Sequence, residues 1–282
     1  MDKRRMCPHC RAFITSRDRV CPYCQGVVGP RAIDRRDPKA ILGGFIPHAR
    51  FTTSIILLIN FGLFAATVLF SMRAGNANAL FDLDGRTLFD FGAKYRDAIV
   101  LGQWWRLVTA GFLHGGILHL LMNSWVLFDL GAQVEEIYGS TRLLVIYFAA
   151  TVGGFYLSMI WTPALSVGAS AGILGLIGAM IALGVRHRAH PLGGAIRSLY
   201  VRWAVYGLAL GLLPGLRVDN AAHIGGLAAG FVVAYAAGTP RLVGGWGEHL
   251  WRILSYLCLA LTALAFLSMY LWLAAVSPAA VR

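Results

Sequence analysis

Seven stretches of mainly apolar residues, separated by short polar segments, dominate this chain. Each is close to the roughly 20 residues that a helix needs to cross the hydrocarbon core of a bilayer. The fourth and sixth stretches are rich in Gly and Ala, which is typical of closely packed central helices. We therefore predict an all-α polytopic membrane domain over residues 51–275, with helices at about 51–72, 115–137, 142–160, 170–186, 199–215, 221–238 and 249–275.

Composition and charge favour the same interpretation. Of 282 residues, 57% are hydrophobic and only 13% are charged, with a mean hydropathy of +0.64. A soluble domain carries about 25% charged residues, and a disordered chain is far less hydrophobic. A net charge of +12 would usually suggest a nucleic-acid partner, but 18 of the 25 Lys and Arg residues fall on stretches that share the N-terminal side of the predicted topology. We expect a lipid bilayer and no nucleic acid as partner.

The same charge bias predicts the orientation and location of the protein. Because Lys and Arg accumulate on cytoplasmic loops, the N-terminus is predicted to be cytoplasmic. No cleavable signal peptide is expected, since the chain begins with a polar segment and the first long apolar stretch starts near Phe51. We expect a multi-pass protein of the plasma (inner) membrane.

Residues 1–28 differ from the rest of the chain. They contain two C-x-x-C motifs, which place four thiols at the spacing of a structural zinc site, Cys7, Cys10, Cys21 and Cys24. Disulfides or iron remain alternatives. The segment resembles zinc-ribbon or rubredoxin-type knuckles, and we predict a zinc-ribbon-like cytoplasmic module, with a protein partner as one possible role. Residues 29–50, rich in Pro, Gly and charge, are predicted to be a linker.

The first group of polar residues within an apolar stretch comprises His114, His119 and Asn123. Residues 119 and 123 are four apart and so share one face of a helix. Polar groups in a membrane are costly and often functional. A strip that only bonds to a neighbouring helix would explain the pattern equally well.

The second and third groups combine one polar residue with several glycines. Ser170 follows Gly168 by two residues and is followed by a second glycine two residues later, which permits close backbone approach. His223 precedes Gly226 and Gly230, which form a seam of small residues four apart. Close helix packing alone would account for either group.

Taken together, the three groups indicate nucleophilic catalysis. A serine needs a base to act as a nucleophile, and histidine is the usual base. The glycine seam would bring His223 near Ser170. His119, Asn123 and the Ser170 amide would then donate hydrogen bonds to an oxyanion. In the predicted orientation all three groups lie toward the outer side, where water has access.

At this point the chain resembles the rhomboid family of intramembrane serine proteases, over about residues 51–275. The matching pieces occur in family order and are Trp105-Arg106, His114…His119…Asn123, Gly131-Ala-Gln-Val-Glu135, Gly168-Ala-Ser170-Ala-Gly172 and Ala222-His223-Ile-Gly-Gly226.

The resemblance implies a six-helix core, here followed by one additional C-terminal helix. It implies Ser170 as nucleophile and His223 as general base, with no cofactor for catalysis. The groups expected to stabilise the oxyanion or the substrate are Asn123, His119, Gly168 and His114. Structural roles are expected for Trp105, Arg106, Glu135, Gly226 and Gly230. Substrates would be membrane-anchored proteins cleaved in or near a transmembrane helix that contains helix-destabilising residues.

One position departs from the family pattern. Many members have Tyr four residues after the nucleophile, where it stacks under the catalytic histidine, whereas this chain has Leu174. A catalytically silent relative that binds membrane helices is therefore the main alternative, although both Ser170 and His223 are present. A transporter is a second alternative, but the chain lacks the paired intramembrane charges and the internal repeat expected of one.

Overall fold

The computed structural model describes residues 4–7, 9–15, 18–28, 50–213, 217–240 and 246–276. The chain divides into two compact units, Met1–Pro47 and His48–Arg282. The predicted linker, apart from Arg50, lies outside the described residues.

The N-terminal unit is built around one short hairpin. Strands β1 (Arg4–Met6) and β2 (Phe13–Thr15) pair antiparallel, with Met6 opposite Phe13. A second, isolated bridge joins Val20 to Val27. The buried apolar residues described in this unit are few, Cys7, Ile14, Cys21 and Val28, so the unit depends on more than apolar burial for its stability.

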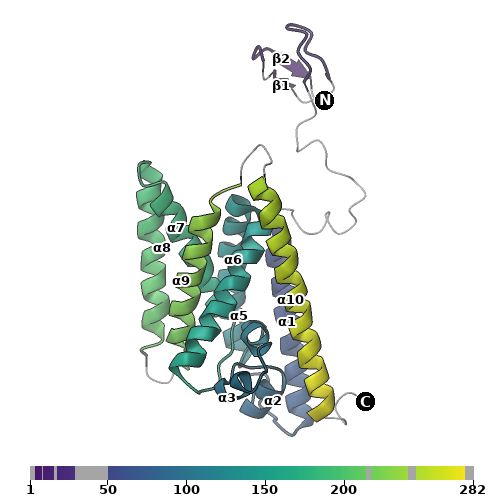
Figure 1. The fold of residues 1–282 in the computed structure, drawn as a ribbon, viewed down its shortest axis with the longest axis vertical. Coiled ribbons are helices and arrows are strands. Elements are labelled where there is room, and N and C mark those ends of the chain that lie inside the picture. Colours follow the sequence, from purple (N-terminus) through teal and green to yellow (C-terminus); the bar gives the residue numbers. More distant parts are fainter. Residues whose placement is uncertain are drawn as a thin grey trace. The chain divides into compact units, whose positions relative to one another are not determined.

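The larger unit is helical (Figure 1). Its main helices are α1 (Phe51–Arg73), α5 (Ile117–Val126), α6 (Ala132–Trp161), α7 (Ser170–Arg186), α8 (Pro191–Leu210), α9 (Asn220–Ala237) and α10 (Trp246–Val276). The π-helical turn η4 (Leu127–Gly131) joins α5 directly to α6. Short helices fill the connection between α1 and α5, namely α2 (Gly85–Asp90), α3 (Arg96–Val100), α4 (Arg106–Thr109) and the 3₁₀ turn η3 (Ala110–Phe112).

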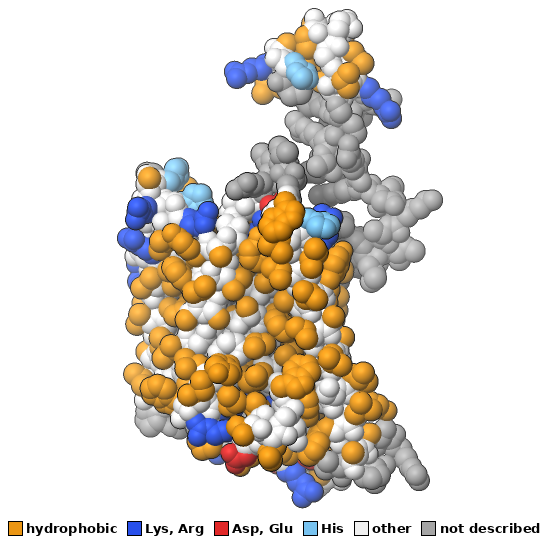
Figure 2. All heavy atoms as spheres, in the orientation of Figure 1, with side chains coloured by type: hydrophobic (Ala, Val, Ile, Leu, Met, Phe, Trp, Pro, Cys, Tyr) orange, Lys and Arg blue, Asp and Glu red, His pale blue; other side chains and the backbone are white. Residues whose placement is uncertain are grey.

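Four helical stretches among the described residues are long and apolar enough to cross a membrane. They are Phe51–Arg73, Ile117–Trp161, Asn220–Ala237 and Trp246–Ala275, and Ser170–Arg186 is a shorter apolar helix. Hydrophobic side chains cover much of the visible face of this unit, His side chains lie at the end where α10 begins, and Lys and Arg side chains lie at both ends (Figure 2). The prediction of an all-α polytopic membrane protein is confirmed.

Two helix boundaries differ from the apolar pattern. The α6 element is interrupted at Gly139, whose φ of 77° takes the backbone out of the helix, so two helices meet there across a kink. Helix α8 begins at Pro191 rather than near 199, because the His190 side chain accepts a hydrogen bond from the Leu192 amide (3.3 Å) and so caps the helix.

Helices α6, α7 and α9 pack backbone to backbone through small residues. A Cβ placed on Gly226 would lie 2.2 Å from the Ala171 carbonyl oxygen, and one on Gly230 would lie 2.1 Å from that of Gly175. On the α6 side, a Cβ on Gly154 would lie 2.6 Å from the Ala222 carbonyl oxygen. No larger side chain fits at these points, so the helix separation is fixed by glycine.

The first turns of α1 and α10 are held by side chains on either side of the Gly139 kink, through hydrogen bonds and an ion pair. Glu135 accepts hydrogen bonds from the Thr52 and Thr53 amides (2.8 and 3.0 Å) and from the Thr53 hydroxyl (2.8 Å). On the other side of the kink, Arg142 makes a two-pronged ion pair with Glu248 at 2.8 and 2.7 Å. These contacts satisfy the first amides of α1 and place α10 beside α6.

We predict that Glu135→Ala destabilises the protein, because it leaves two backbone amides and a hydroxyl of α1 without their acceptor. The expected loss is about 2–4 kcal/mol, or about 5–10 °C in the midpoint of thermal unfolding followed by tryptophan fluorescence in detergent. The matched control is Glu136→Ala, the exposed neighbour on the same helix. Equal midpoints for the two variants would contradict the assigned role of Glu135.

Candidate functional site

Ser170 is the first residue of α7 and directly follows a segment whose backbone conformation favours glycine. Gly168 has a φ of 138°, a conformation that favours glycine, and its amide donates to the Ala110 carbonyl at 2.9 Å. The Ser170 amide belongs to the first turn of α7, where helix amides have no acceptor within the helix. Such an amide is suited to bind a developing negative charge.

His119 from α5 lies against the same glycine. A Cβ on Gly168 would be 2.9 Å from His119 Nε2 and 3.5 Å from Ser170 Oγ, so both side-chain atoms lie around one α-carbon. The Gly115 amide donates to His119 Nδ1 at 3.4 Å. In the neutral ring this leaves the proton on Nε2, which makes that nitrogen a donor beside Ser170.

The two other polar residues of this group are buried, Asn123 on α5 and His114 just before the helix begins. Asn123 donates to the His119 carbonyl at 2.9 Å, which uses one of its two amide protons and leaves the other available. The His114 ring meets the His119 ring edge to face, with 5.1 Å between centroids. The His114 ring nitrogens make no hydrogen bond within the described residues. We see a packing contact with His119 but no direct contact between His114 and Ser170.

His223 comes from the first turn of α9. It is buried, lies close enough to His119 for electrostatic interaction, and its ring interacts with the backbone of Gly207 on α8. No hydrogen bond joins it to Ser170 in the part of the chain that the structure describes. Catalytic hydrogen bonds are often long in an unliganded enzyme and shorten in the reacting complex.

Asp219 has a structural role at the start of α9. Its side chain accepts from the Ala222 amide at 2.9 Å and so caps the helix, and it also accepts a short hydrogen bond from the Ser158 hydroxyl of α6. The carboxylate thus fixes the beginning of the helix that carries His223.

Leu174, the departure from the family pattern, is buried one turn after Ser170. A Cβ on Gly207 would lie 3.6 Å from its side chain, in ordinary van der Waals contact. Leu174 thus packs toward α8 at the same glycine whose backbone interacts with His223. An aliphatic side chain there supplies apolar contact but no ring to stack under the imidazole.

Sequence reasoning missed a fully buried lysine that holds the segment before Ser170. Lys94 Nζ donates to the carbonyls of Thr162 (2.8 Å) and Ala164 (2.9 Å), and its backbone pairs with Ser166 in both directions. Burial lowers the pKa of Lys94, and the negative charge of Asp219 opposes that shift. No motif marks this residue, because its partners lie about 70 positions further along the chain.

The residues expected to be structural organise the connection between α1 and α5. Arg106 is fully buried, donates to the carbonyls of Phe89 (2.6 Å) and Ala93 (3.0 Å), and stacks over the Trp105 ring at 4.6 Å. These contacts hold α2 and α4 together in the same connection that carries Lys94. Glu135 lies at the opposite ends of the helices, where it caps α1.

The four N-terminal cysteines form a separate cluster. Their sulfur atoms all lie within 4.8 Å of one another, and two pairs, Cys7–Cys24 and Cys10–Cys21, are 3.7 Å apart. A disulfide requires about 2.05 Å between sulfurs. Four thiolates at about 2.3 Å from a tetrahedral Zn²⁺ would be about 3.8 Å apart. The Cys10 and His9 amides lower the pKa of the Cys7 thiol to about 6, which favours the metal-binding thiolate.

Comparison with known proteins adds independent information. A profile described as the Rhomboid domain matches residues 101–240. Rhomboid protease GluP of Bacillus subtilis is 39% identical over 184 residues, 64% of this chain and 34% of that protein. Rhomboid-like protease 3 of Toxoplasma gondii is 37% identical over 186 residues, 63% of this chain and 67% of that protein. RHOMBOID-like protein 4 of Arabidopsis thaliana is 33% identical over 184 residues, 59% of this chain and 42% of that protein. The chain thus spans between about a third and two thirds of these relatives.

We predict that Lys94→Met slows the reaction of Ser170 with a fluorophosphonate probe by about ten- to a hundredfold, because the segment before Ser170 loses two of its anchors. The reaction is followed by intact mass at a temperature where the variant is folded. Arg86→Met, an exposed basic residue in the same connection, is the control and should react like wild type. A wild-type rate for Lys94→Met would exclude a role in positioning.

Proposed function

This chain belongs to the rhomboid family, and from that premise we propose that it is an intramembrane serine endopeptidase that uses Ser170 and His223 as a catalytic dyad. The observation that carries the proposal is the convergence of Ser170 Oγ and His119 Nε2 on Gly168, with His223 brought in by the α9–α7 glycine contact. Substrates are membrane-anchored proteins.

The proposed mechanism follows from the chemistry of these groups. Ser170 Oγ attacks the peptide carbonyl while His223 accepts its proton. The oxyanion that forms receives hydrogen bonds from His119 Nε2, the Ser170 amide and the remaining Asn123 amide proton. His223 then protonates the leaving amine, and water hydrolyses the acyl-enzyme. The chain's own residues supply every group, with no cofactor.

Substrate class is proposed from what cleavage requires. A peptide carbonyl within a helix is occupied by a hydrogen bond from the amide four residues further along the chain. Attack therefore needs a segment that unwinds readily, so we propose substrates with Gly, Pro or other helix-destabilising residues in or near the transmembrane helix. The glycines around Ser170 favour a small residue before the scissile bond.

The orientation is proposed from the distribution of positive charge. Basic residues are concentrated on the N-terminal side, which places that side in the cytoplasm of a plasma (inner) membrane. Ser170, His223 and His119 all lie at or near the N-terminal ends of their helices. In this orientation the site opens to the outer side, where water reaches it.

One observation favours a second function. Leu174 replaces the ring that would stack under His223, and the described residues show no hydrogen bond between His223 and Ser170. A catalytically silent relative that binds transmembrane helices without cleaving them would tolerate both features. Retention of the serine and the histidine supports the protease.

For the N-terminal unit we propose one structural Zn²⁺ held by four cysteines, Cys7, Cys10, Cys21 and Cys24. The sulfur separations and the lack of a larger apolar core among the described residues support this. When bound, the metal supplies folding free energy and takes no part in proteolysis. The unit itself is proposed to be a cytoplasmic module available to a protein partner.

We predict that wild-type protein in detergent is labelled by a fluorophosphonate and cleaves a membrane-anchored model substrate, whereas Ser170→Ala and His223→Ala do neither. Labelling is measured in gel and by intact mass. The exposed residues Ser198 and His249, each changed to Ala, serve as matched controls and should retain both activities. Folded wild-type protein that neither reacts nor cleaves would favour the silent relative, and Leu174→Tyr is then the first variant to examine.

We predict one zinc ion per chain in the purified full-length protein, measured by elemental analysis. Cys10→Ser removes one thiolate and should lower the zinc content to well below one. Cys258→Ser, a change to the buried cysteine of α10, is the matched control and should retain the metal. Full zinc content in the Cys10→Ser variant would contradict the assigned ligand set.

A further inference from the structure

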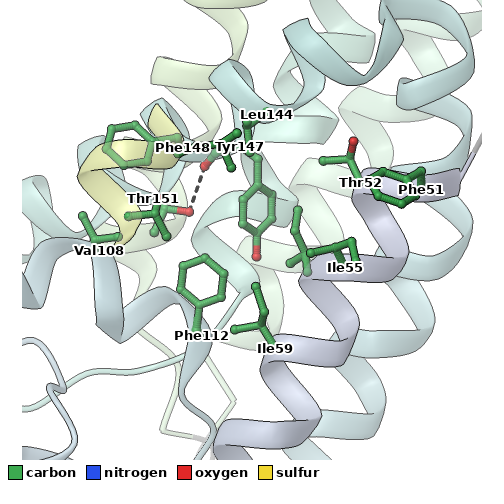
Figure 3. Close-up of a pocket in the computed structure, with 13 residues that line it drawn as sticks. Phe51, Thr52, Ile55, Ile59, Val108, Phe112, Leu144, Tyr147, Phe148 and Thr151 are labelled. Carbon is green, nitrogen blue, oxygen red and sulfur yellow. Dashed lines mark hydrogen bonds between the residues drawn. The ribbon is translucent and has the colours of Figure 1, made fainter. Parts of the chain in front are cut away.

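An apolar cavity of about 180 Å³ is lined mainly by α1, α6 and α10, and Ser170 is not among its lining residues (Figure 3). Its walls are almost entirely apolar, and include Ile55 and Ile59 of α1, Phe148 of α6 and Leu259 of α10, with Phe112 at one side. An apolar cavity of about 150 Å³ stays dry and takes up hydrocarbon groups. Water is therefore an unsuitable occupant, and a hydrocarbon chain is a suitable one.

The cavity lies within the part of the molecule that faces lipid. Apart from Val108 and Phe112, its lining residues come from the spans Phe51–Arg73, Ile117–Trp161 and Trp246–Ala275. Leu259, one of its residues, is 51% exposed at the molecular surface. The acyl chains of the bilayer are thus the hydrocarbon most available to this cavity.

A positive charge lies where a lipid headgroup would be. Arg252 is seven residues before Leu259 on α10, so the two share one face, and Arg252 lies about 10 Å nearer to the end of the helix. Other Lys and Arg side chains, and His side chains, also lie at this end of the unit (Figure 2). Basic positions at the ends of membrane helices are suited to anionic headgroups.

One residue of the cavity wall, Tyr147 of α6, also contacts the helix that carries Ser170. Tyr147 lines the cavity, and its ring fills the space above Gly172, where a Cβ would lie 2.5 Å from the ring. In Figure 3 the Tyr147 hydroxyl lies among Ile59 and Phe112, and it makes no hydrogen bond with the described residues. An occupant of the cavity would hold this ring against Gly172, two residues from Ser170.

From this arrangement we propose that the cavity binds one acyl chain of an anionic glycerophospholipid, whose headgroup pairs with Arg252. The site does not depend on proteolysis and would be present in a catalytically silent protein as well. Occupancy restricts Tyr147 and thereby α7.

The test uses the full chain in phosphatidylcholine nanodiscs that contain a trace of phosphatidylglycerol with a photoreactive acyl chain. After irradiation, cross-linked peptides are identified by mass spectrometry. We expect cross-links at the α1, α6 and α10 residues of the cavity wall, and competition by unlabelled phosphatidylglycerol. Leu259→Trp should lower this labelling about tenfold, the loss expected when about two methylene groups can no longer be buried.

The matched control is Leu257→Trp, which adds the same bulk on the same helix at a position that is 53% exposed and outside the cavity wall. Its labelling should equal that of wild type. Arg252→Gln should remove the preference for phosphatidylglycerol over a phosphatidylcholine probe. Labelling spread evenly over the lipid-facing surface and unchanged by Leu259→Trp would overturn the proposal, as would a protein segment cross-linked in the cavity.

Discussion

The direct contact between the backbones of α9 and α7 is the constraint on which the site depends. Lipid chains are as apolar as a leucine side chain, so burial of apolar surface does not drive these helices together. The helices associate because a close approach of their backbones increases the number of dispersion contacts. This approach requires glycine at positions 226 and 230. With this separation fixed, His223 on one helix and Ser170 on the other are presented to the same region. A single β-carbon at the contact would move them apart.

Polar contacts at the ends of the helices also hold α7 and α9 in position. Lys94 holds the segment before α7, Asp219 caps α9, and Ser158 of α6 donates to Asp219. The side chains that hold the helices of Ser170 and His223 thus lie close together, where α6 meets the connection between α1 and α5. Buried polar groups are costly without partners. Lys94 and Asp219 bond to backbone groups, so each side chain holds a segment of the main chain in one position.

The long apolar helices could be predicted from the sequence, because apolar run length alone sets them. The stretch 170–186 coincides with α7, and 51–72 differs from α1 by one residue. The start of α8 could not be predicted in this way, since it depends on a cap from His190. Lys94 could not be found either, because its contacts join parts of the chain that no local pattern connects. Nor does the glycine pattern show which glycine meets which helix, since Gly172 packs on Tyr147 of α6. Ala171 and Gly175, four residues apart, occupy the face toward α9, and Gly172 lies one position around the helix. The polar residues around Ser170 could be picked out from the sequence, because Ser, His and Asn within apolar stretches are costly and often functional.

We propose that the glycine contact between α9 and α7 brings His223 to Ser170. The most direct test is the rate of fluorophosphonate reaction at Ser170 in Gly226→Ala, compared with Gly62→Ala, where an added Cβ meets nothing within 4 Å. Both variants keep the serine and the histidine. We expect a rate lowered by about tenfold or more in folded Gly226→Ala and an unchanged rate in Gly62→Ala. A wild-type rate in Gly226→Ala would contradict it.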